Sequence, residues 1–293
     1  MINQIPFVSV IIPVYNDSGR LRSCLESLRA QSYPSDRYEI IVVDNGSDEN
    51  IADIVSEFDT ATLEFEKIKG SYAARNKGIS FARGEILAFT DSDCKPTQNW
   101  IKEGVKALIS TENCGLVAGE IELYYRQPDS LSPAEIYEYI VAFQQRKNIE
   151  MLHFGATANV FTFKSIFKDV GLFNSTMKSG GDREWGNRVY SAGYLQIYAA
   201  SARVYHPARH TIEQLLRKST RITLGVKEKN IKAIAKTYVR MLFVPPIDLI
   251  RKGLNSDGLS ILQKLQFLFV VFIVRYSAVW QTTRLLFGAQ PKR

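Results

Sequence analysis

Short apolar runs alternate with helix-like segments through the first 120 residues, and this alternation constrains the fold more than any other feature. The runs are residues 8–12, 39–43, 85–89 and 114–118. Runs of this kind are typical of strands covered on both faces. Two sets of apolar residues between them recur at the spacing of one helix face: Leu21, Cys24, Leu25 and Leu28, then Ile51, Ile54, Val55 and Phe58. The alternation predicts an α/β fold with a mostly parallel sheet, whose ligands bind at the carboxyl ends of the strands.

The pattern is less regular after residue 120. The spacing predicts a helix over 133–147, with Pro133 in its first turn, and a second helix over 182–192 that ends at Gly193. Residues 194–205 return to strand character. The segment 211–293 reads as a helical tail, so we predict a body over 1–210 and an extension over 211–293.

The C-terminal third of the chain is strongly basic. Residues 203–293 hold 17 of the 37 Lys and Arg residues but only four of the 30 Asp and Glu residues. Such a charge balance suggests a polyanionic partner, either nucleic acid or an anionic lipid leaflet. Apolar residues flank these charges and no recognised nucleic-acid motif is present, so we expect a membrane surface and no nucleic acid.

The most apolar part of the tail is residues 265–274, which is shorter than the roughly 20 residues of a membrane span. Lys264, Arg275 and Thr282 fall on one narrow polar stripe of a helix. This pattern favours an amphipathic helix in the bilayer interface, and a helix packed on the catalytic domain is the alternative. No signal peptide is apparent, and three cysteines without a CxxC pair fit a reducing compartment. We therefore expect a cytoplasmic protein, peripheral on the inner face of the plasma membrane.

Polar clusters follow the first three predicted strands. They are Pro13, Tyr15 and Asn16 after the first, Asp44 after the second, and Asp91 and Asp93 after the third. Because parallel strands end at one edge of a sheet, we expect these side chains to converge there. Alternate residues of an extended segment point the same way, so Asp91 and Asp93 could hold one Mg²⁺ or Mn²⁺ ion; a solvated turn is the alternative.

Three further residues are candidates for chemistry. Arg75 follows a Gly entry and could bind phosphate or a pyrimidine edge, or it could lie exposed on a surface helix. Asp182 stands in a Gly-rich loop that enters a helix, where it could be an N-cap or a general base. His206 follows a strand and is a candidate third metal ligand.

The order of these motifs resembles the family 2 glycosyltransferases, which have the GT-A fold, over residues 7 to about 225. The matching segments are 8–16, 31–34 (Q-[ST]-x-P), 43–47 (VDDGS), 74–76 (ARN), 91–93 (DxD), 180–182 (GGED) and 205–206. The resemblance implies a GT-A domain over 1–210, with a Rossmann-like nucleotide-sugar half at about 1–120 and an acceptor half at about 121–210.

The resemblance also assigns roles. It implies nucleotide contacts from Pro13, Tyr15, Asn16, Asp44, Arg75 and Asp91. It implies a metal site of Asp91, Asp93 and His206, with Asp93 the more direct ligand. Asp182 would be the catalytic base, with Glu184 the alternative. The acceptor side would be lined by Gly155, Ala156, Glu184 and Trp185.

Three positions depart from the family pattern. Asn45 replaces the second Asp of VDDGS, and Gly181 replaces the Glu of GGED. Lys218 stands where the QxxRW motif of processive polysaccharide synthases has Trp. Transfer of a single sugar is therefore the better expectation.

The function that the resemblance implies is an inverting, metal-dependent hexosyl transfer from a UDP-linked donor. The acceptor would be a hydroxyl in glycan, polysaccharide or glycolipid synthesis. A dinucleotide oxidoreductase would share the parallel sheet, but the GxGxxG fingerprint is absent after the first strand. A non-catalytic nucleotide-sugar-binding protein and a basic nucleic-acid- or membrane-binding protein are the remaining alternatives.

Overall fold

The computed structural model describes residues 5–225 and 244–286, and the chain forms two compact units. Unit 1 contains Met1–Glu122 and Phe143–His206, and unit 2 contains Leu123–Ala142 and Pro207–Arg293. The predicted division at residue 210 differs in one respect, because residues 123–142 group with the C-terminal part. The physical reason is that Ile136 and Ile140 pack against Phe267 and Val271 in one hydrophobic cluster.

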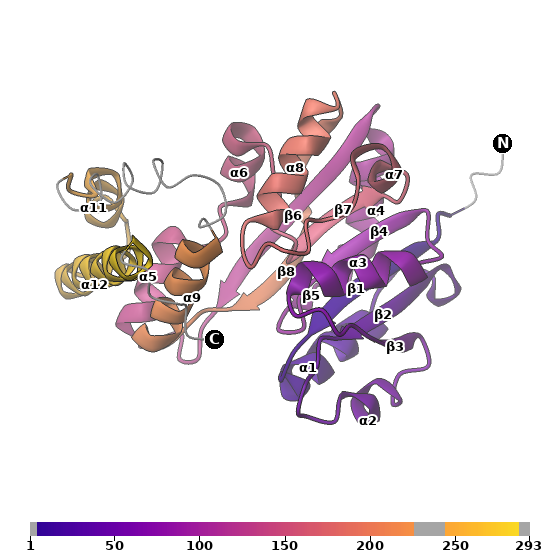
Figure 1. Ribbon diagram of the computed structural model, residues 1–293, viewed down its shortest axis with the longest axis horizontal. Helices are drawn as coiled ribbons and strands as arrows, with labels where there is room; N and C mark the ends of the chain where they lie inside the picture. Colours follow the sequence, from indigo (N-terminus) through magenta and orange to yellow (C-terminus); the bar gives the residue numbers. More distant parts are fainter. Residues whose placement is uncertain (1–4, 226–243, 287–293) are drawn as a thin grey trace. The chain divides into compact units, whose positions relative to one another are not determined.

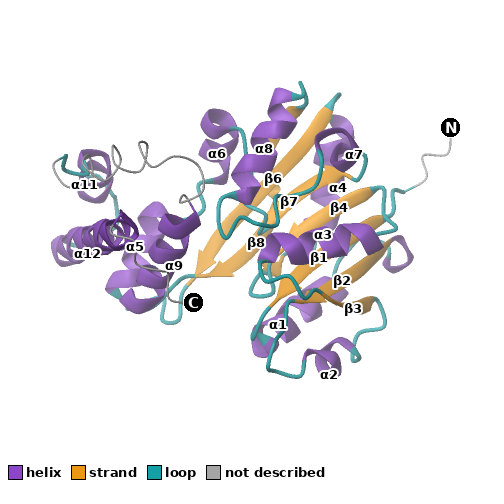
Figure 2. Cartoon of the chain, viewed as in Figure 1, coloured by secondary structure: helices purple, strands orange, loops and turns teal. Residues whose placement is uncertain are grey.

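Unit 1 is built on an eight-stranded sheet with the order β3-β2-β1-β4-β7-β6-β8-β5 (Figures 1 and 2). The strands are β1 Val8–Val14, β2 Tyr38–Asp44, β3 Ala61–Phe65, β4 Ile86–Thr90, β5 Lys95–Pro96, β6 Cys114–Tyr124, β7 Asn159–Phe163 and β8 Leu195–Pro207. Strands β1 to β4 pair in parallel, whereas β7 pairs antiparallel with β4 and β6, and β5 pairs antiparallel with β8. The predicted α/β fold with a parallel sheet is confirmed in the part that carries the polar strand ends.

Helices cover both faces of this sheet (Figure 1). Alternate residues of β1 point to opposite faces, so Val10 and Ile12 join one hydrophobic cluster and Ile11 joins the other. The first cluster includes residues of α1 (Ser18–Arg29), α2 (Ile51–Val55) and α4 (Trp100–Ser110). The second includes residues of α3 (Ser71–Phe81), α7 (Ile166–Val170) and α8 (Gly181–Ser191). The predicted apolar faces of α1 and α2 are buried as expected.

The predicted helix over 133–147 is divided into α5 (Pro133–Val141) and α6 (Gln145–Leu152). Phe143 lies between them with φ of 43°, a left-handed conformation that ends a helix for a non-glycine residue. The predicted helix over 182–192 is α8, and Gly193 follows it with φ of 88°. Strands β3, β5 and β7 were not predicted, because β3 is half-exposed, β5 has only two residues and β7 follows a loop without a turn signature.

Unit 2 consists of helices: α5, α9 (Ile212–Gly225), α11 (Ile247–Leu254) and α12 (Ile261–Leu286). One face of α12 packs against α5 and α9, with Val270 in a cluster with Ala134 and Leu215. Glu138 on α5 is 1% exposed and pairs with Arg209 and Lys218. Among the described residues there is one helix, Ile261–Arg284, that is long enough and apolar enough to cross a membrane, judged by length and composition.

The predicted polar stripe of α12 is engaged with backbone carbonyls of unit 2. Thr282 is buried and donates to the Ala278 carbonyl, Lys264 donates to the Leu254 carbonyl, and Arg275 donates to the Val244 carbonyl. Polar side chains are tolerated on this face because each of them donates to a backbone carbonyl and so avoids the cost of an unpaired donor. The exposed residues of α12 lie on a different face of the helix.

Candidate active site

The turn after β1 is fixed to the loop after β2 by Asn16. Its backbone N–H donates to Ser47 Oγ (2.9 Å), and its Oδ1 accepts from the Asp48 N–H (2.7 Å). Asn16 has φ of 48°, a conformation that Asn tolerates better than most residues. Asp44 is buried at the end of β2, and its Oδ1 accepts from the Ser47 N–H. Tyr15 is 57% exposed beside this turn, so its ring is open to a ligand.

Asn45 has a structural role that explains its departure from the family motif. Its Nδ2 donates to the carbonyls of Glu66 (2.9 Å) and Ile68 (2.8 Å), and its Oδ1 accepts from the Gly70 N–H (2.6 Å). An aspartate could accept from Gly70 but could not donate to either carbonyl. Asn45 therefore fixes the segment that leads into α3, on which Arg75 lies.

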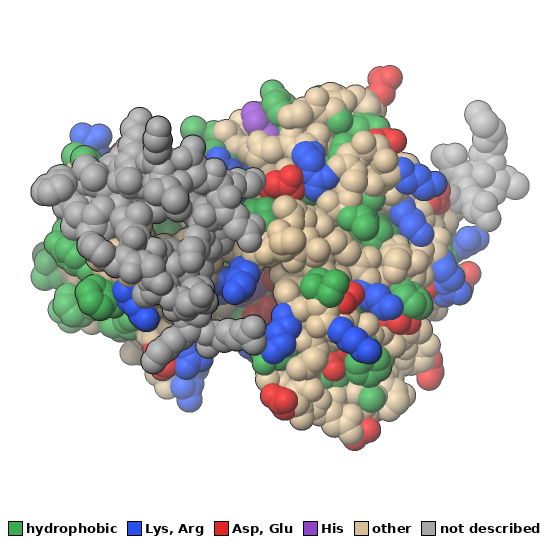
Figure 3. Space-filling view, in the orientation of Figure 1, with side chains coloured by type: hydrophobic (Ala, Val, Ile, Leu, Met, Phe, Trp, Pro, Cys, Tyr) green, Lys and Arg blue, Asp and Glu red, His purple; other side chains and the backbone are tan. Residues whose placement is uncertain are grey.

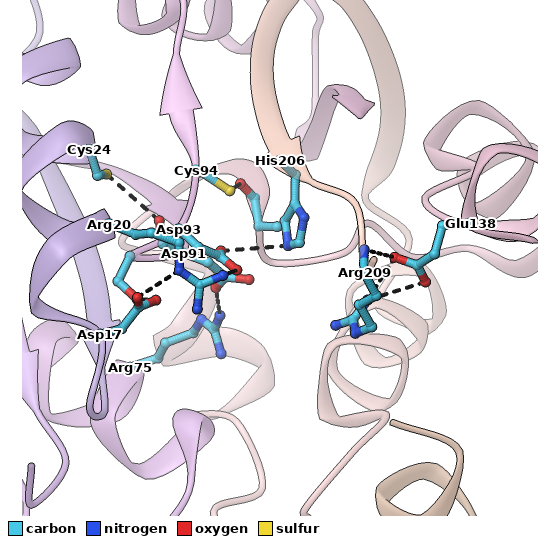
Figure 4. Close-up of polar contacts among 12 residues, drawn as sticks. Asp17, Arg20, Cys24, Arg75, Asp91, Asp93, Cys94, Glu138, His206 and Arg209 are labelled. Atoms are coloured by element: carbon cyan, nitrogen blue, oxygen red, sulfur yellow. Dashed lines mark hydrogen bonds and ion pairs between the residues drawn. The ribbon is translucent and has the colours of Figure 1, made fainter. Parts of the chain in front are cut away.

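The carboxylates of Asp91 and Asp93 have different partners, as Figure 4 shows. Asp91 Oδ1 accepts from the guanidinium of Arg75, whose side chain is almost fully buried. Asp93 lies 3.5 Å from His206 Nε2 and 3.5 Å from Arg20 Nη1. The structure thus brings Asp93 and His206 together, while Asp91 is oriented by Arg75.

The pairing of β5 with β8 places His206 beside Asp93. Lys95 pairs with Tyr205 and Pro96 with Val204 in antiparallel register, so the residues before Lys95 lie next to the residue after Tyr205. The imidazole of His206 is buried against the ring of Phe143, with ring centroids 4.5 Å apart. A two-residue strand therefore fixes the distance between the two candidate ligands.

Ligand atoms of Asp93, Cys94 and His206 lie within 4.8 Å of one another. Burial raises the pKa of the Cys94 thiol well above its ordinary value, and its Sγ is directed at the Ala158 carbonyl (3.9 Å). Burial also raises the pKa of Asp93, while His206 acts in the opposite direction. Burial destabilises the ionised form of a carboxylate because it removes solvating water. A bound cation stabilises that ionised form again by its opposite charge.

Arg75 has an unused hydrogen-bond donor. Its Nε is buried and has no hydrogen-bond partner among residues 5–225 and 244–286. Leaving a buried donor unsatisfied costs about 1–3 kcal/mol, more for a charged group. The guanidinium is held by Asp91, and a phosphate oxygen is a suitable acceptor for the remaining donor.

Two charged residues of this cluster were missed from the sequence. Arg20 Nε pairs with Asp17 Oδ1 (2.7 Å), and Asp17 Oδ2 accepts from Ser92 Oγ (3.2 Å) (Figure 4). Both residues lie at the start of α1, directly after the turn that follows β1. Their position at the first crossover helix was the signal that could have identified them, because that helix begins at the edge where the strands end.

Asp182 lies in the first turn of α8 and faces α3. Its Oδ1 accepts from the Tyr72 hydroxyl (3.3 Å) and from the Arg183 N–H (2.9 Å). Burial raises the pKa of Asp182, and the Arg183 amide, Arg75 and Tyr72 oppose this shift in that order. Tyr72 was not predicted from the sequence, although it lies one helical turn before Arg75. A partly desolvated carboxylate with a raised pKa is suited to accept a proton.

Two residues expected near the acceptor are engaged elsewhere. Both carboxylate oxygens of Glu184 pair with Arg188, at 3.0 and 3.1 Å, which leaves Asp182 as the carboxylate without a bidentate cation partner in this turn. Trp185 is 1% exposed and stacks on Phe167 in the hydrophobic core, and its acceptor role stays a prediction.

Gly155 and Ala156 lie in the loop before β7. A Cβ at Gly155 would come within 2.8 Å of Ala118 and 2.9 Å of Val160, so this position has room only for glycine. The Ala156 N–H donates to Gln145 Oε1 at 2.8 Å. These contacts hold the loop in place, and the acceptor role of both residues stays a prediction.

Comparison with known proteins agrees with this geometry. The sequence profile described as "Glycosyl transferase family 2" matches residues 9–171. Glycosyltransferase AglE of Haloferax volcanii is 39% identical over 230 residues, which are 77% of this chain and 74% of AglE. Two relatives from Bacillus subtilis are matched over only 28% and 59% of their own lengths.

Solved structures share the fold. The mannosyltransferase PcManGT from Pyrobaculum calidifontis, in complex with GDP-Man and Mn²⁺, has a TM-score of 0.60 at 19% identity, covering 98% of this chain and 76% of that one. S. aureus TarS 1-349 in complex with UDP has a TM-score of 0.54 at 18% identity, covering 98% and 93%. Because its motifs stand at the strand ends of a GT-A sheet and the profile covers over half of its length, the chain belongs to glycosyl transferase family 2.

Proposed function

We propose that this protein transfers one sugar from a UDP-linked donor to an acceptor hydroxyl, with inversion at the anomeric carbon. The observation that carries the proposal is that Arg75 pairs with Asp91 and lies over the ring of Tyr72, whose hydroxyl bonds to Asp182. Arg75 pairs with Asp91, and it lies near enough to Asp182 to lower the pKa of that group. A phosphate-binding cation next to a candidate base is the arrangement that displacement of a nucleoside diphosphate requires.

Asp93 and His206 are the residues that would hold a divalent cation. A carboxylate oxygen suits both Mg²⁺ and Mn²⁺, whereas an imidazole favours transition metals, so we propose Mn²⁺ with Mg²⁺ as the weaker substitute. The protonated Cys94 thiol would remain outside the coordination shell. When bound, the cation would neutralise charge on the diphosphate. Asp91 would act with Arg75 on the donor, and Pro13, Tyr15, Asn16 and Asp44 would line its nucleoside.

The reaction would be a single displacement. Asp182 takes the proton of the acceptor hydroxyl as the oxygen forms its bond to the anomeric carbon. The bond from that carbon to the diphosphate oxygen breaks, and the diphosphate leaves with the electron pair. The guanidinium of Arg75 stabilises the charge that develops on the leaving group. Tyr72 keeps the Asp182 carboxylate in position through its hydrogen bond.

The donor and acceptor assignments rest on comparison and composition. A fold neighbour solved with UDP supports a uridine donor, and another solved with GDP-Man makes a guanosine donor the alternative. Lys218, in place of the synthase Trp, supports single transfer. The basic C-terminal third supports an acceptor glycan or lipid-linked glycan at the cytoplasmic face of the plasma membrane.

Titration calorimetry with UDP and GDP, each with and without Mn²⁺, tests the donor site. We expect Mn²⁺-dependent binding of UDP that is lost in Asp93→Ala. Tighter binding of GDP would replace the uridine assignment, and no binding of either nucleotide to folded protein would overturn the proposed function.

A second pair of variants tests the base. Asp182→Asn should reduce transfer by about 10²–10⁴-fold, the usual contribution of a general base, while nucleotide affinity is retained. Glu184→Gln is the matched control, because it changes a neighbouring carboxylate that is paired with Arg188. An equal loss in Glu184→Gln, with Asp182→Asn still active, would move the base to Glu184.

A further inference from the structure

The outward face of α12 is dominated by apolar side chains among its described residues. Seven described side chains of this helix are exposed, and every one is aliphatic or aromatic: Ile261, Leu262, Leu265, Phe269, Phe272, Tyr276 and Trp280. Figure 3 shows the hydrophobic side chains gathered where α12 lies. Phe269 and Trp280 are 62% and 61% exposed, so these rings are largely accessible to solvent. A contiguous exposed apolar patch of this kind is typical of an interaction site.

The exposed residues form one stripe. Positions 261, 265, 269, 272, 276 and 280 are separated by steps of three or four, which places them on one side of a helix. The polar residues Lys264, Arg275 and Thr282 lie on the other side, where they bond to carbonyls of unit 2. A helix whose outer face met water would carry its polar residues on that face and its apolar residues against the rest of the protein.

We propose that this apolar face of α12 docks on a bilayer containing anionic lipids, with the helix parallel to the membrane plane. The charge of this part of the chain identifies the partner, since residues 203–293 hold 17 basic and four acidic side chains. Aromatic residues with a polar edge prefer the interfacial zone, and Tyr276 and Trp280 occupy one end of the stripe. Apolar area and attraction to anionic lipid together determine such binding.

Two other arrangements fit the structure less well. A spanning helix would carry its packing partners α5 and α9 to bilayer depth, together with the buried Glu138 and its cations Arg209 and Lys218. Ionised groups are costly at that depth. Pairing of two copies through α12 would bring two strongly basic segments together, and like charge opposes such association.

Trp280 provides an intrinsic reporter for the test. The chain has three tryptophans, and Trp100 and Trp185 are 0% and 1% exposed in unit 1. A change in the fluorescence of exposed tryptophan on vesicle binding therefore reports on α12. The measurement uses the full chain without donor or acceptor. A lack of vesicle binding would therefore not contradict the proposed sugar transfer, and a lack of sugar transfer would not contradict the proposed docking.

The experiment mixes the protein with vesicles of phosphatidylcholine and phosphatidylglycerol, or of phosphatidylcholine alone. Flotation and tryptophan emission are recorded at low and high salt. We expect binding to the anionic vesicles that weakens with salt, with a blue shift of emission and quenching by bromine-labelled lipid chains. The double variant Phe269→Glu with Trp280→Glu should lose binding by on the order of a hundredfold or more, because two aromatic side chains no longer enter the lipid.

Phe65→Glu is the matched control, because Phe65 is a comparably exposed aromatic residue (61%) on β3 of unit 1. Trp280→Phe should retain vesicle binding and lose the emission shift. Two results would overturn the proposal. One is vesicle binding that the double variant leaves unchanged. The other is a dimer in light scattering that the same variant dissociates, which would make a second copy the occupant of this face.

Discussion

The hydroxyl of Tyr72 donates a hydrogen bond to Oδ1 of Asp182 across 3.3 Å, and this bond joins the first turn of α3 to the first turn of α8. Gly181 lies against the Tyr72 ring, where a Cβ would come within 2.7 Å of it. The glycine that replaces the family's Glu therefore lets the tyrosine approach the carboxylate. Tyr72 is a positioning residue for the proposed base.

Tyr72→Phe should shift the acid limb of the pH profile of kcat/KM to higher pH. Burial raises the pKa of Asp182, and the Tyr72 hydrogen bond partly offsets that effect, so removing the bond raises the pKa further. A hydrogen bond to a charged group is worth about 1.5–3 kcal/mol, which corresponds to a shift of about one to two pH units. The proposed base is active when deprotonated, so activity should fall most at acidic pH.

Tyr139→Phe is the control for that profile, because Tyr139 is 52% exposed on α5. Its profile should coincide with that of the wild type. A Tyr72→Phe enzyme with an unshifted acid limb would remove Tyr72 from its positioning role, even if kcat fell.

His206→Ala should weaken Mn²⁺ binding. The imidazole lies 3.5 Å from the Asp93 carboxylate, and loss of one proposed ligand should reduce affinity by at least about 10-fold, the smaller effect reported for outer-shell partners. Mn²⁺ affinity can be followed by electron paramagnetic resonance, and activity should return as Mn²⁺ is raised. His210→Ala is the control, and unchanged Mn²⁺ affinity in His206→Ala would exclude His206 as a ligand.

Asn45→Asp should destabilise the fold although it restores the family's usual residue. The carbonyls of Glu66 and Ile68 would lose their donor and meet a negative charge. Two lost bonds at a part-buried site should lower the free energy of unfolding by about 2 kcal/mol or more, as measured by urea denaturation. Asn99→Asp should have little effect, because exposed Asn99 acts as an acceptor for Ser32 Oγ. Equal stability of both variants would contradict the structural role of Asn45.

Glu138→Gln should destabilise unit 2 at neutral pH. Burial opposes ionisation of Glu138, but Lys218 and Arg209 outweigh it and hold its pKa below the ordinary value. Removing the anion takes away the counter-charge that Glu138 supplies to Arg209 and Lys218, at a cost of about 3 kcal/mol in the free energy of unfolding. Thermal unfolding should show a lower transition than in Glu213→Gln, which breaks an exposed pair with Arg217.

The pH dependence of the same variant follows from the direction of the shift. A carboxyl with a depressed pKa contributes its full stabilisation above the unfolded-state pKa of about 4.3 and loses it as pH falls through the folded-state value. Acidification below about pH 4.3 should therefore reduce the stability of the wild type more than that of Glu138→Gln. An identical slope in both proteins would show that the folded-state pKa is not lowered.

The convergence of the strand-end carboxylates could be predicted because it depends on local signals. Asp44, Asp91 and Asp93 follow apolar runs directly, and the parallel arrangement of those runs is enough to bring their ends together. The position of His206 could not be predicted from local signals alone, because it depends on the pairing of β8 with a two-residue strand that has no periodicity of its own.

Other features depend on contacts between distant segments. The family resemblance placed Trp185 on the acceptor side, and its ring stacks on Phe167. Arg20 and Asp17 belong to no recognised motif. The orientation of α12 was ambiguous, because a narrow polar stripe can face water or bond to carbonyls, and only the position of α5 and α9 decides between them.

The β5–β8 register has a consequence for biosynthesis. Asp93 and His206 are far apart in the chain, so the loop between them must close before both lie in one site. During translation the strands β1 to β4 can form while the segment carrying His206 is still unmade. The proposed cation site therefore stays incomplete until synthesis has passed β8, because His206 lies near the end of that strand.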